Sequence, residues 1–160
     1  HHVTGVEHGE TGSPSEAPKN RKKMMEKRLR KLQHLRFATP LNVNAKHEEP
    51  DILFVGINST IGTIQEAMER LEKDGLKVNH VHVRLVHPFP TEALRPYVEK
   101  AKMVMVVENN ATGQLANLIK LHVGHAEKVK NILKYDGNPF LPREIETQAK
   151  ELFTLEKELI

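Results

Sequence analysis

The side chains best suited to binding or catalysis are Glu108, Asn109 and Asn110, an acid and two amides directly after an apolar run. Such a group presents several hydrogen-bond donors and acceptors at one place. It could bind a polar ligand or seat against another subunit, and helix capping is an equally good interpretation. Glu108 could act as a general base if burial raised its pKa. The spacing shows no partner for that role.

A second candidate is the turn from Gly56 to Gly62, where Asn58, Ser59 and Thr60 are all good helix N-caps. A helix N-terminus there could hold an anion. The turn lacks the Gly-Lys-Ser/Thr ending of a Walker loop and does not match GxGxxG. A plain strand-to-helix turn is the more common situation. A freestanding nucleotide- or phosphate-binding α/β module stays open as the alternative function.

The histidines give weaker signals. His80 and His82 lie two apart on a predicted strand, so their side chains point to the same face. That spacing can ligate a metal, but no third ligand follows at a suitable distance, so we expect a packed or solvated pair and no metal site. His87 precedes a proline at a strand end. Because no Ser/His/Asp or Cys/His arrangement is supported by spacing, we assign no catalytic residue.

Composition limits the function classes. The 160 residues include no Cys, which excludes disulfides, cysteine nucleophiles and cysteine-held iron–sulfur clusters from this chain. No apolar run approaches the roughly 20 residues that span a bilayer, so we expect no membrane partner and a cytoplasmic location. The chain starts at His1-His2 without Met, and we interpret it as a piece of a longer protein, the two histidines being native or left from a tag.

The positive charge is concentrated near the N-terminus. A helix is expected over 20–35, after a Gly- and Pro-rich loop over 1–20. Met25, Leu29 and Leu32 fall at i, i+4 and i+7, so one face could dock on something. The other faces are basic, with Glu26 as the one acid. No recognition motif accompanies the charge, so a solvated face or a subunit-docking arm is favoured over a nucleic-acid adaptor.

Apolar runs of strand length alternate with helical patterns. Strands are expected over 52–55, 77–86, 103–107 and 129–133, with a short edge strand over 41–44; helices are expected to begin after Thr60, at the cap Thr91, near Leu115 and at Pro142. Gly56 should end the first strand and Pro96 should kink or shorten its helix. This alternation predicts an α/β fold, a three-layer α/β/α sandwich with a mostly parallel sheet. The polar turns then gather at one sheet edge.

Four motifs occur in a fixed order: Val55–Gly62, Arg84–Pro90, Val107–Leu115 and Leu133–Phe140. Together they resemble the C-terminal domain of the alpha subunit of 2-oxoacid:ferredoxin oxidoreductases. The Glu-Asn-Asn and Lys-Tyr-Asp-Gly forms look most like the 2-oxoglutarate synthase branch. The segment from Thr4 to Lys31 looks like the connector that leaves that subunit's pyrimidine-binding domain, with Gly9 where the family commonly has an acid.

The resemblance implies a transketolase C-terminal-like fold, in which one strand of a sheet of about five is antiparallel. Leu41–Asn44 is our candidate for that edge strand. The implied organisation is an interdomain connector with a basic helix over 1–40 and the α/β domain over 41–160.

The family's whole enzyme decarboxylates a 2-oxoacid on thiamine diphosphate with Mg²⁺, forms an acyl-CoA from CoA, and reduces ferredoxin through an iron–sulfur cluster. The resemblance implies that this domain holds none of these cofactors and is inactive alone. Its partners would be the beta subunit and, through the whole complex, ferredoxin, in a heterotetramer of two alpha–beta pairs. We expect it to dock subunits or border the active site through Asn58, Ser59, Thr60, His87, Glu108, Asn109, Asn110 and Gln114. The acid used, and whether CoA touches this domain, stay open.

Overall fold

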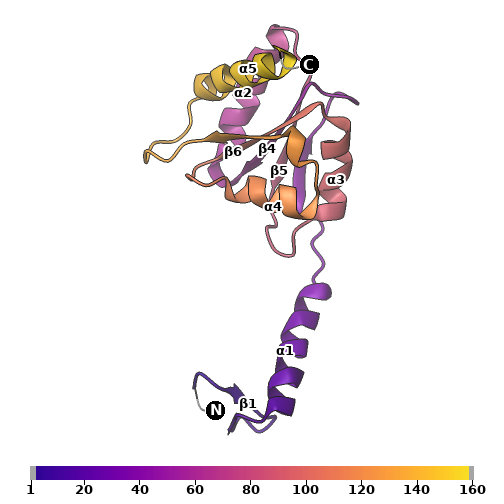
Figure 1. Cartoon of the computed structure of the whole chain (residues 1–160), viewed down its shortest axis with the longest axis vertical. Coiled ribbons are helices and arrows are strands. Elements are labelled where there is room, and N and C mark those ends of the chain that lie inside the picture. The colour runs from indigo at the N-terminus through magenta and orange to yellow at the C-terminus, as the bar shows by residue number, and fades with distance from the viewer. Residues whose placement is uncertain (1–2, 159–160) are drawn as a thin grey trace. The chain divides into compact units, whose positions relative to one another are not determined.

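The structure is a computed structural model that describes residues 3–158. Contacts divide the chain into two units, one that ends at Ala38 and one that begins at Thr39. The first unit contains a short antiparallel pair, β1 (Glu7–His8) and β2 (Pro14–Ser15), followed by helix α1 (Pro18–Gln33). The sequence predicts a loop over 1–20, and the structure differs because paired strands and the first turn of α1 lie within this segment (Figure 1).

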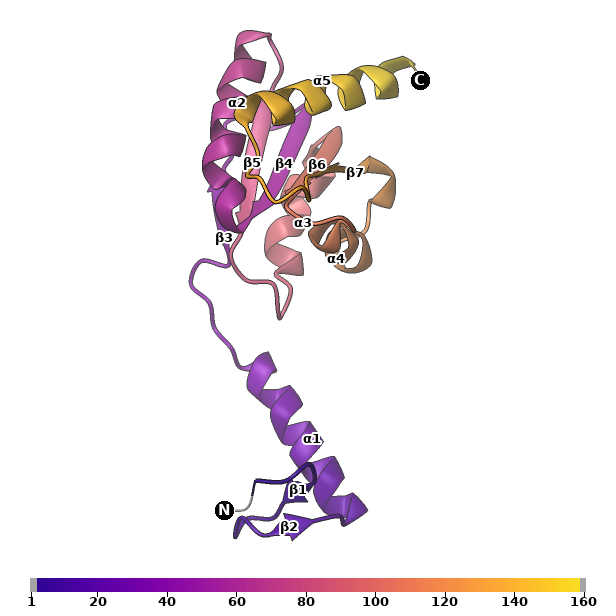
Figure 2. The same ribbon diagram turned by 90° about the vertical axis from the view of Figure 1, so that its left-hand side faces the viewer.

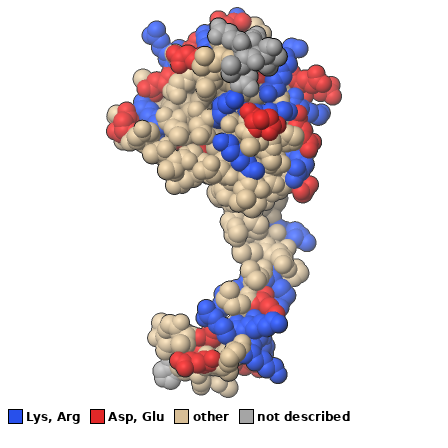
Figure 3. All heavy atoms as spheres, viewed as in Figure 1, with Lys and Arg blue, Asp and Glu red and all other residues tan. Residues whose placement is uncertain are grey.

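One carboxylate connects β1 to α1. The Glu7 side chain is 8% exposed and accepts hydrogen bonds of 3.0 Å from Arg21 Nη1 and 3.0 Å from Arg28 Nη1. The hydrogen bond from Arg28 is the largest of the influences that lower the pKa of Glu7. The remaining Lys and Arg side chains of α1 make it the basic helix that the sequence indicates (Figure 3).

The second unit is built on a five-stranded sheet of order β3-β5-β4-β6-β7. Its strands are β3 (Leu41–Asn44), β4 (Ile52–Ile57), β5 (Val78–Val83), β6 (Met103–Glu108) and β7 (Val129–Leu133). β3 pairs antiparallel with β5, and every other pairing is parallel. The predicted fold class and the antiparallel edge strand are confirmed.

Helices cover both faces of the sheet (Figure 2). They are α2 (Ile61–Lys73), α3 (Thr91–Lys100), α4 (Gln114–His122) and α5 (Pro142–Glu158), with short 3-10 turns η1 (Asn58–Thr60) and η2 (Ala126–Lys128). Ile52 and Phe54 of β4 pack in the core with α2 and α5, while Leu53 and Val55 pack in the core with α3 and α4. The alternation along a fully buried central strand explains the unbroken apolar run.

Two strand ends were predicted wrongly. β4 runs through Gly56 to Ile57, because both residues pair with β5. β5 ends at Val83 and not at residue 86, because the backbone N–H groups of Arg84 and Leu85 bond to the Pro40 carbonyl, at 2.9 and 3.2 Å. α3 does include Pro96 and ends at Lys100, so the kink expected at Pro96 stays a prediction.

The predicted caps are confirmed only in part. Thr60 does occupy the position directly before α2, although its side chain makes no capping hydrogen bond there. The cap predicted at Thr91 is wrong, because the residue before α3 is Pro90 and Thr91 already lies in the helix. Asn58 and Ser59 form a 3-10 turn instead of a capping position. No helix among residues 3–158 is long and apolar enough to cross a bilayer.

Gly56 is required by close packing. A Cβ atom there would lie 2.5 Å from Ile64 Cδ1, 2.7 Å from Thr60 Oγ1 and 3.1 Å from His82 Nδ1. We expect Gly56→Ala to lower the free energy of unfolding by about 1–3 kcal/mol, the usual cost of overpacking a core. Urea unfolding measures it.

Gly62, in the first turn of α2, is the matched control, because a Cβ atom added there would have no neighbouring atom within 4 Å. Gly62→Ala should raise stability by up to about 1 kcal/mol through helix propensity. Equal effects of the two substitutions would contradict the packing explanation.

Candidate functional site

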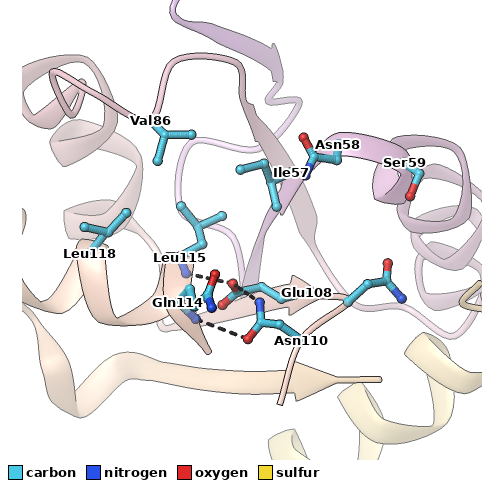
Figure 4. A pocket seen from close by; sticks show the side chains of 10 residues that line it. Ile57, Asn58, Ser59, Val86, Glu108, Asn110, Gln114, Leu115 and Leu118 are labelled. Atoms are coloured by element: carbon cyan, nitrogen blue, oxygen red, sulfur yellow. Dashed lines mark hydrogen bonds between the residues drawn. The ribbon is translucent and has the colours of Figure 1, made fainter. Parts of the chain in front are cut away.

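Two strand-to-helix turns meet at the carboxyl edge of the sheet and enclose a cavity of about 280 Å³ (Figure 4). One turn joins β4 to α2 and the other joins β6 to α4. The lining residues are Ile57, Asn58, Ser59, Val86, Glu108, Asn109, Asn110, Gln114, Leu115 and Leu118. In parallel α/β folds ligands gather at this edge, so the cavity is the candidate site.

Glu108 is a capping residue for α4. Its carboxylate is 1% exposed and accepts hydrogen bonds from the backbone N–H of Leu115 at 2.7 Å and of Ala116 at 3.0 Å. The Asn110 amide donates a third, at 2.8 Å. These bonds satisfy N–H groups at the helix start and place a negative charge at the positive end of its dipole. The carboxylate is therefore committed to the fold, and the general-base interpretation loses its support.

Asn110 completes the same cap. Its Oδ1 accepts hydrogen bonds from the backbone N–H of Gly113 at 2.8 Å and of Thr112 at 3.0 Å. Between them, Glu108 and Asn110 occupy the N–H groups that a bound anion would use at the start of α4. The capping interpretation of the Glu-Asn-Asn motif is thus correct for its first and third residues.

Asn109, between them, is exposed and makes no hydrogen bond with a described residue. The side chains of Asn58, Ser59 and Gln114 are also exposed at the cavity. Amide and hydroxyl groups offer donors and acceptors but no charge. The surface left for a partner is consequently polar and neutral.

The β4–α2 turn is shaped by two groups behind it. Asn58 has a φ of 56°, a conformation that Asn adopts more readily than most residues. Its carbonyl accepts a hydrogen bond of 3.1 Å from His82 Nε2, which assigns the proton of the neutral ring to Nε2. Thr60 is buried, and its Oγ1 donates to the Ile57 carbonyl at 2.9 Å and accepts from the Ile57 N–H at 3.1 Å.

Of the eight residues predicted for the docking edge, the cavity brings together Asn58, Ser59, Glu108, Asn109, Asn110 and Gln114. Thr60 lies buried behind its turn, and His87 is exposed but does not line the cavity. Sequence reasoning missed the apolar side of the site, to which Val86 and Leu118 contribute (Figure 4). Val86 was assigned to a strand, and only its position after the end of β5 leaves it 41% exposed.

His80 and His82 face the same side, as predicted, and both are buried. Their rings lie edge to face with centroids 5.5 Å apart. Burial lowers the pKa of His80 to about 4, and burial also lowers the pKa of His82. Within the described part of the chain no three His, Asp or Glu residues cluster as metal ligands would. Burial and the contact between the two rings make this a packed pair.

Comparison with known proteins identifies the family and the fold. Residues 50–145 match the family described as pyruvate:ferredoxin oxidoreductase core domain II. The alpha subunit of 2-oxoacid:ferredoxin oxidoreductase from Saccharolobus solfataricus is 34% identical over 93% of this chain and 24% of its own length. The 2-oxoglutarate synthase subunit KorA of Methanocaldococcus jannaschii is 29% identical over 91% of this chain and 38% of its own.

A solved structure of 2-oxoglutarate:ferredoxin oxidoreductase from Magnetococcus marinus, with 2-oxoglutarate, coenzyme A and succinyl-CoA bound, superposes with a TM-score of 0.79 at 33% identity; it covers 96% of this chain and 27% of that one. A split-gene transketolase at 18% identity shares the fold, with a TM-score of 0.61. The chain spans between about a quarter and two fifths of the length of the curated relatives named here. It belongs to the pyruvate:ferredoxin oxidoreductase core domain II family, in the form found in alpha subunits of 2-oxoacid:ferredoxin oxidoreductases.

Proposed function

We propose that the chain is the C-terminal domain of the alpha subunit of a thiamine-diphosphate-dependent 2-oxoacid:ferredoxin oxidoreductase, with 2-oxoglutarate as the acid. The whole enzyme decarboxylates the acid, transfers the acyl group to CoA and reduces ferredoxin. The similarity to the Saccharolobus solfataricus alpha subunit and to the 2-oxoglutarate synthase subunit KorA supports this assignment, as do the molecules bound in the similar Magnetococcus marinus enzyme.

Within that enzyme the domain docks subunits and does no chemistry itself. The observation that carries this proposal is the use of Glu108: the one carboxylate of the cavity is spent on capping α4. The other side chains that line the cavity are amides, a hydroxyl and aliphatic groups, whereas a general acid or base needs a titratable group within reach of the substrate. The docking residues proposed are Asn58, Ser59, Asn109 and Gln114, positioned by Thr60, Glu108 and Asn110, with His87 at the rim.

The cofactors of the whole enzyme do not fit this cavity. A diphosphate calls for Lys, Arg, Mg²⁺ ligands or free helix N–H groups, and the lining has no Lys, Arg or His. Thiamine diphosphate and Mg²⁺ are accordingly assigned to other parts of the enzyme. The iron–sulfur cluster is assigned there too, because this chain has no Cys to hold it. Residues 1–40 serve as the interdomain connector.

The partners proposed are the beta subunit and, through the whole complex, ferredoxin, in a cytoplasmic assembly of two alpha–beta pairs. The test is co-expression of the full-length parent with its neighbouring reading frame. We expect a thiamine-diphosphate-binding partner to co-purify, together with dye reduction that requires both 2-oxoglutarate and CoA. The parent expressed without the neighbouring frame is the control.

A parent that runs alone without activity, and binds a mononucleotide tightly in calorimetry, would contradict the proposal. In that case the Gly56–Gly62 turn would be the functional site.

A further inference from the structure

The cavity continues into a second hollow at the same edge. This hollow, of about 450 Å³, is lined by Ser59, Asn109, Lys134, Tyr135, Gly137, Asn138 and Pro139. Ser59 and Asn109 line both spaces. The two together form one groove, which runs from Val86 and Leu118 across the shared pair to the turn after β7. We refer to it as the edge groove.

The edge groove has no free charge. Its ionisable side chains besides the Tyr135 phenol are Glu108 and Lys134. Glu108 is held by three hydrogen bonds within the cap of α4. Lys134 Nζ bonds to both carboxylate oxygens of Glu144, at 2.7 and 2.8 Å, and its side chain is 13% exposed. A phosphate or carboxylate ligand would find no counter-charge here.

The polar groups along the groove match those of a polypeptide main chain. The main-chain amides of an extended polypeptide can pair with uncharged side-chain amides and hydroxyls, and they need no counter-charge. Asn58, Ser59, Asn109 and Gln114 supply such groups, and Val86 and Leu118 offer an apolar seat for one aliphatic side chain.

Tyr135 marks the outer end of the groove. It is 72% exposed, and exposed tyrosines are enriched at the centres of protein interfaces. We propose that the edge groove binds an uncharged, extended segment of the partner subunit, with main-chain amides across Ser59 and Asn109 and an aliphatic side chain between Val86 and Leu118. This inference rests on the docking role proposed above and specifies the chemistry of what docks.

The proposed occupant is tested by introducing a negative or a positive charge at Asn109. In the full-length alpha–beta complex, Asn109→Asp and Asn109→Lys should both weaken assembly, on the order of tenfold or more in Kd, because each buries an unpaired charge against a neutral segment. If the groove bound an anionic ligand instead, Asn109→Asp would weaken the binding of that ligand and Asn109→Lys would strengthen it. Mass photometry across subunit concentrations gives Kd, and KM for CoA gives the response of an anionic ligand.

Gln65 supplies the matched control. It is an exposed amide on α2 that lines neither hollow. Gln65→Glu and Gln65→Lys should leave both Kd and KM unchanged. Thermal melts of each variant check folding, which we expect to be retained because the side chain of Asn109 is exposed.

The outcomes separate this inference from the docking role itself. Opposite effects of Asn109→Asp and Asn109→Lys on KM for CoA, with assembly unchanged, would overturn the peptide occupant while leaving the enzyme assignment intact. Loss of alpha self-association in both variants, with alpha–beta assembly unchanged, would make the occupant a second copy and would also overturn the inference. No change in any of these quantities would overturn both the peptide occupant and the docking role.

Discussion

Glu108→Ala should lower the free energy of unfolding by about 3 kcal/mol or more, because it leaves two buried backbone N–H groups without an acceptor, and each such loss costs about 1–3 kcal/mol. Those groups belong to Leu115 and Ala116, which bond to the carboxylate at 2.7 and 3.0 Å. The charge that faces the helix dipole is lost as well. Urea unfolding at several protein concentrations measures the change, with the slope against denaturant checked for constancy.

Two further variants test whether the loss of stability in Glu108→Ala comes from the missing hydrogen-bond acceptor. Glu108→Gln keeps one acceptor oxygen but turns an NH₂ group toward a backbone N–H, so we expect a smaller loss, about 1–2 kcal/mol. Asn109→Ala removes an exposed side chain that makes no hydrogen bond with a described residue and should change stability by less than about 0.5 kcal/mol. Equal stabilities for wild type and Glu108→Ala would show that the carboxylate does not cap α4.

The second large effect is a loss of stability at acidic pH. His80 is 2% exposed and its Nε2 has no hydrogen-bond partner among the described residues. Its pKa of about 4 in the fold lies below the 6.5 of a free histidine. The unfolded chain therefore binds a proton that the folded chain rejects. Stability from the neutral ring is complete above pH 6.5 and is lost as the pH falls toward 4, by about 3 kcal/mol in total.

The measurement is the free energy of unfolding between pH 7.5 and 4, compared with that of His80→Leu. The variant has no ring to protonate, so its stability should fall by about 3 kcal/mol less over this range. The stability of the variant should still fall somewhat with pH, since burial lowers the pKa of His82 as well. His122→Leu, which removes an exposed ring stacked on Phe89, serves as the control. If the stability of His80→Leu fell with pH as steeply as that of the wild type, His80 would not be the source of the acid sensitivity.

The sequence was sufficient for the architecture. Unbroken apolar runs identified β4 and β6, since strands buried on both faces show no alternation. Element ends were less predictable. Gly56 looked like a terminator because glycine usually breaks strands, whereas here it makes room for Thr60 and Ile64. The close approach of this strand residue to side chains of the following turn and helix depends on how α2 packs on the sheet, and no sequence pattern reveals it.

The site was predictable in its residue types and much less so in their roles. The cavity collects most of the predicted polar residues, because parallel strands bring their carboxyl ends to one edge. Whether an amide points into the cavity or into a cap depends on one residue of register. Asn109 and Asn110 are adjacent and chemically identical, yet only Asn110 bonds to the start of α4. Sequence alone could not separate them.

The strand order has a consequence for how the second unit folds. No two hydrogen-bonded neighbours in the sheet are joined by a tight turn: α2 separates β4 from β5, α4 separates β6 from β7, and β3 reaches β5 only past β4 and α2. The sheet therefore has no hairpin from which to nucleate, and such non-local pairing slows folding. During synthesis, the edge of β4 that pairs with β6 stays open until Met103 to Glu108 has been made. A nascent chain stalled before that point would present an apolar, unpaired strand to its neighbours, so aggregation during translation is the hazard that this topology creates.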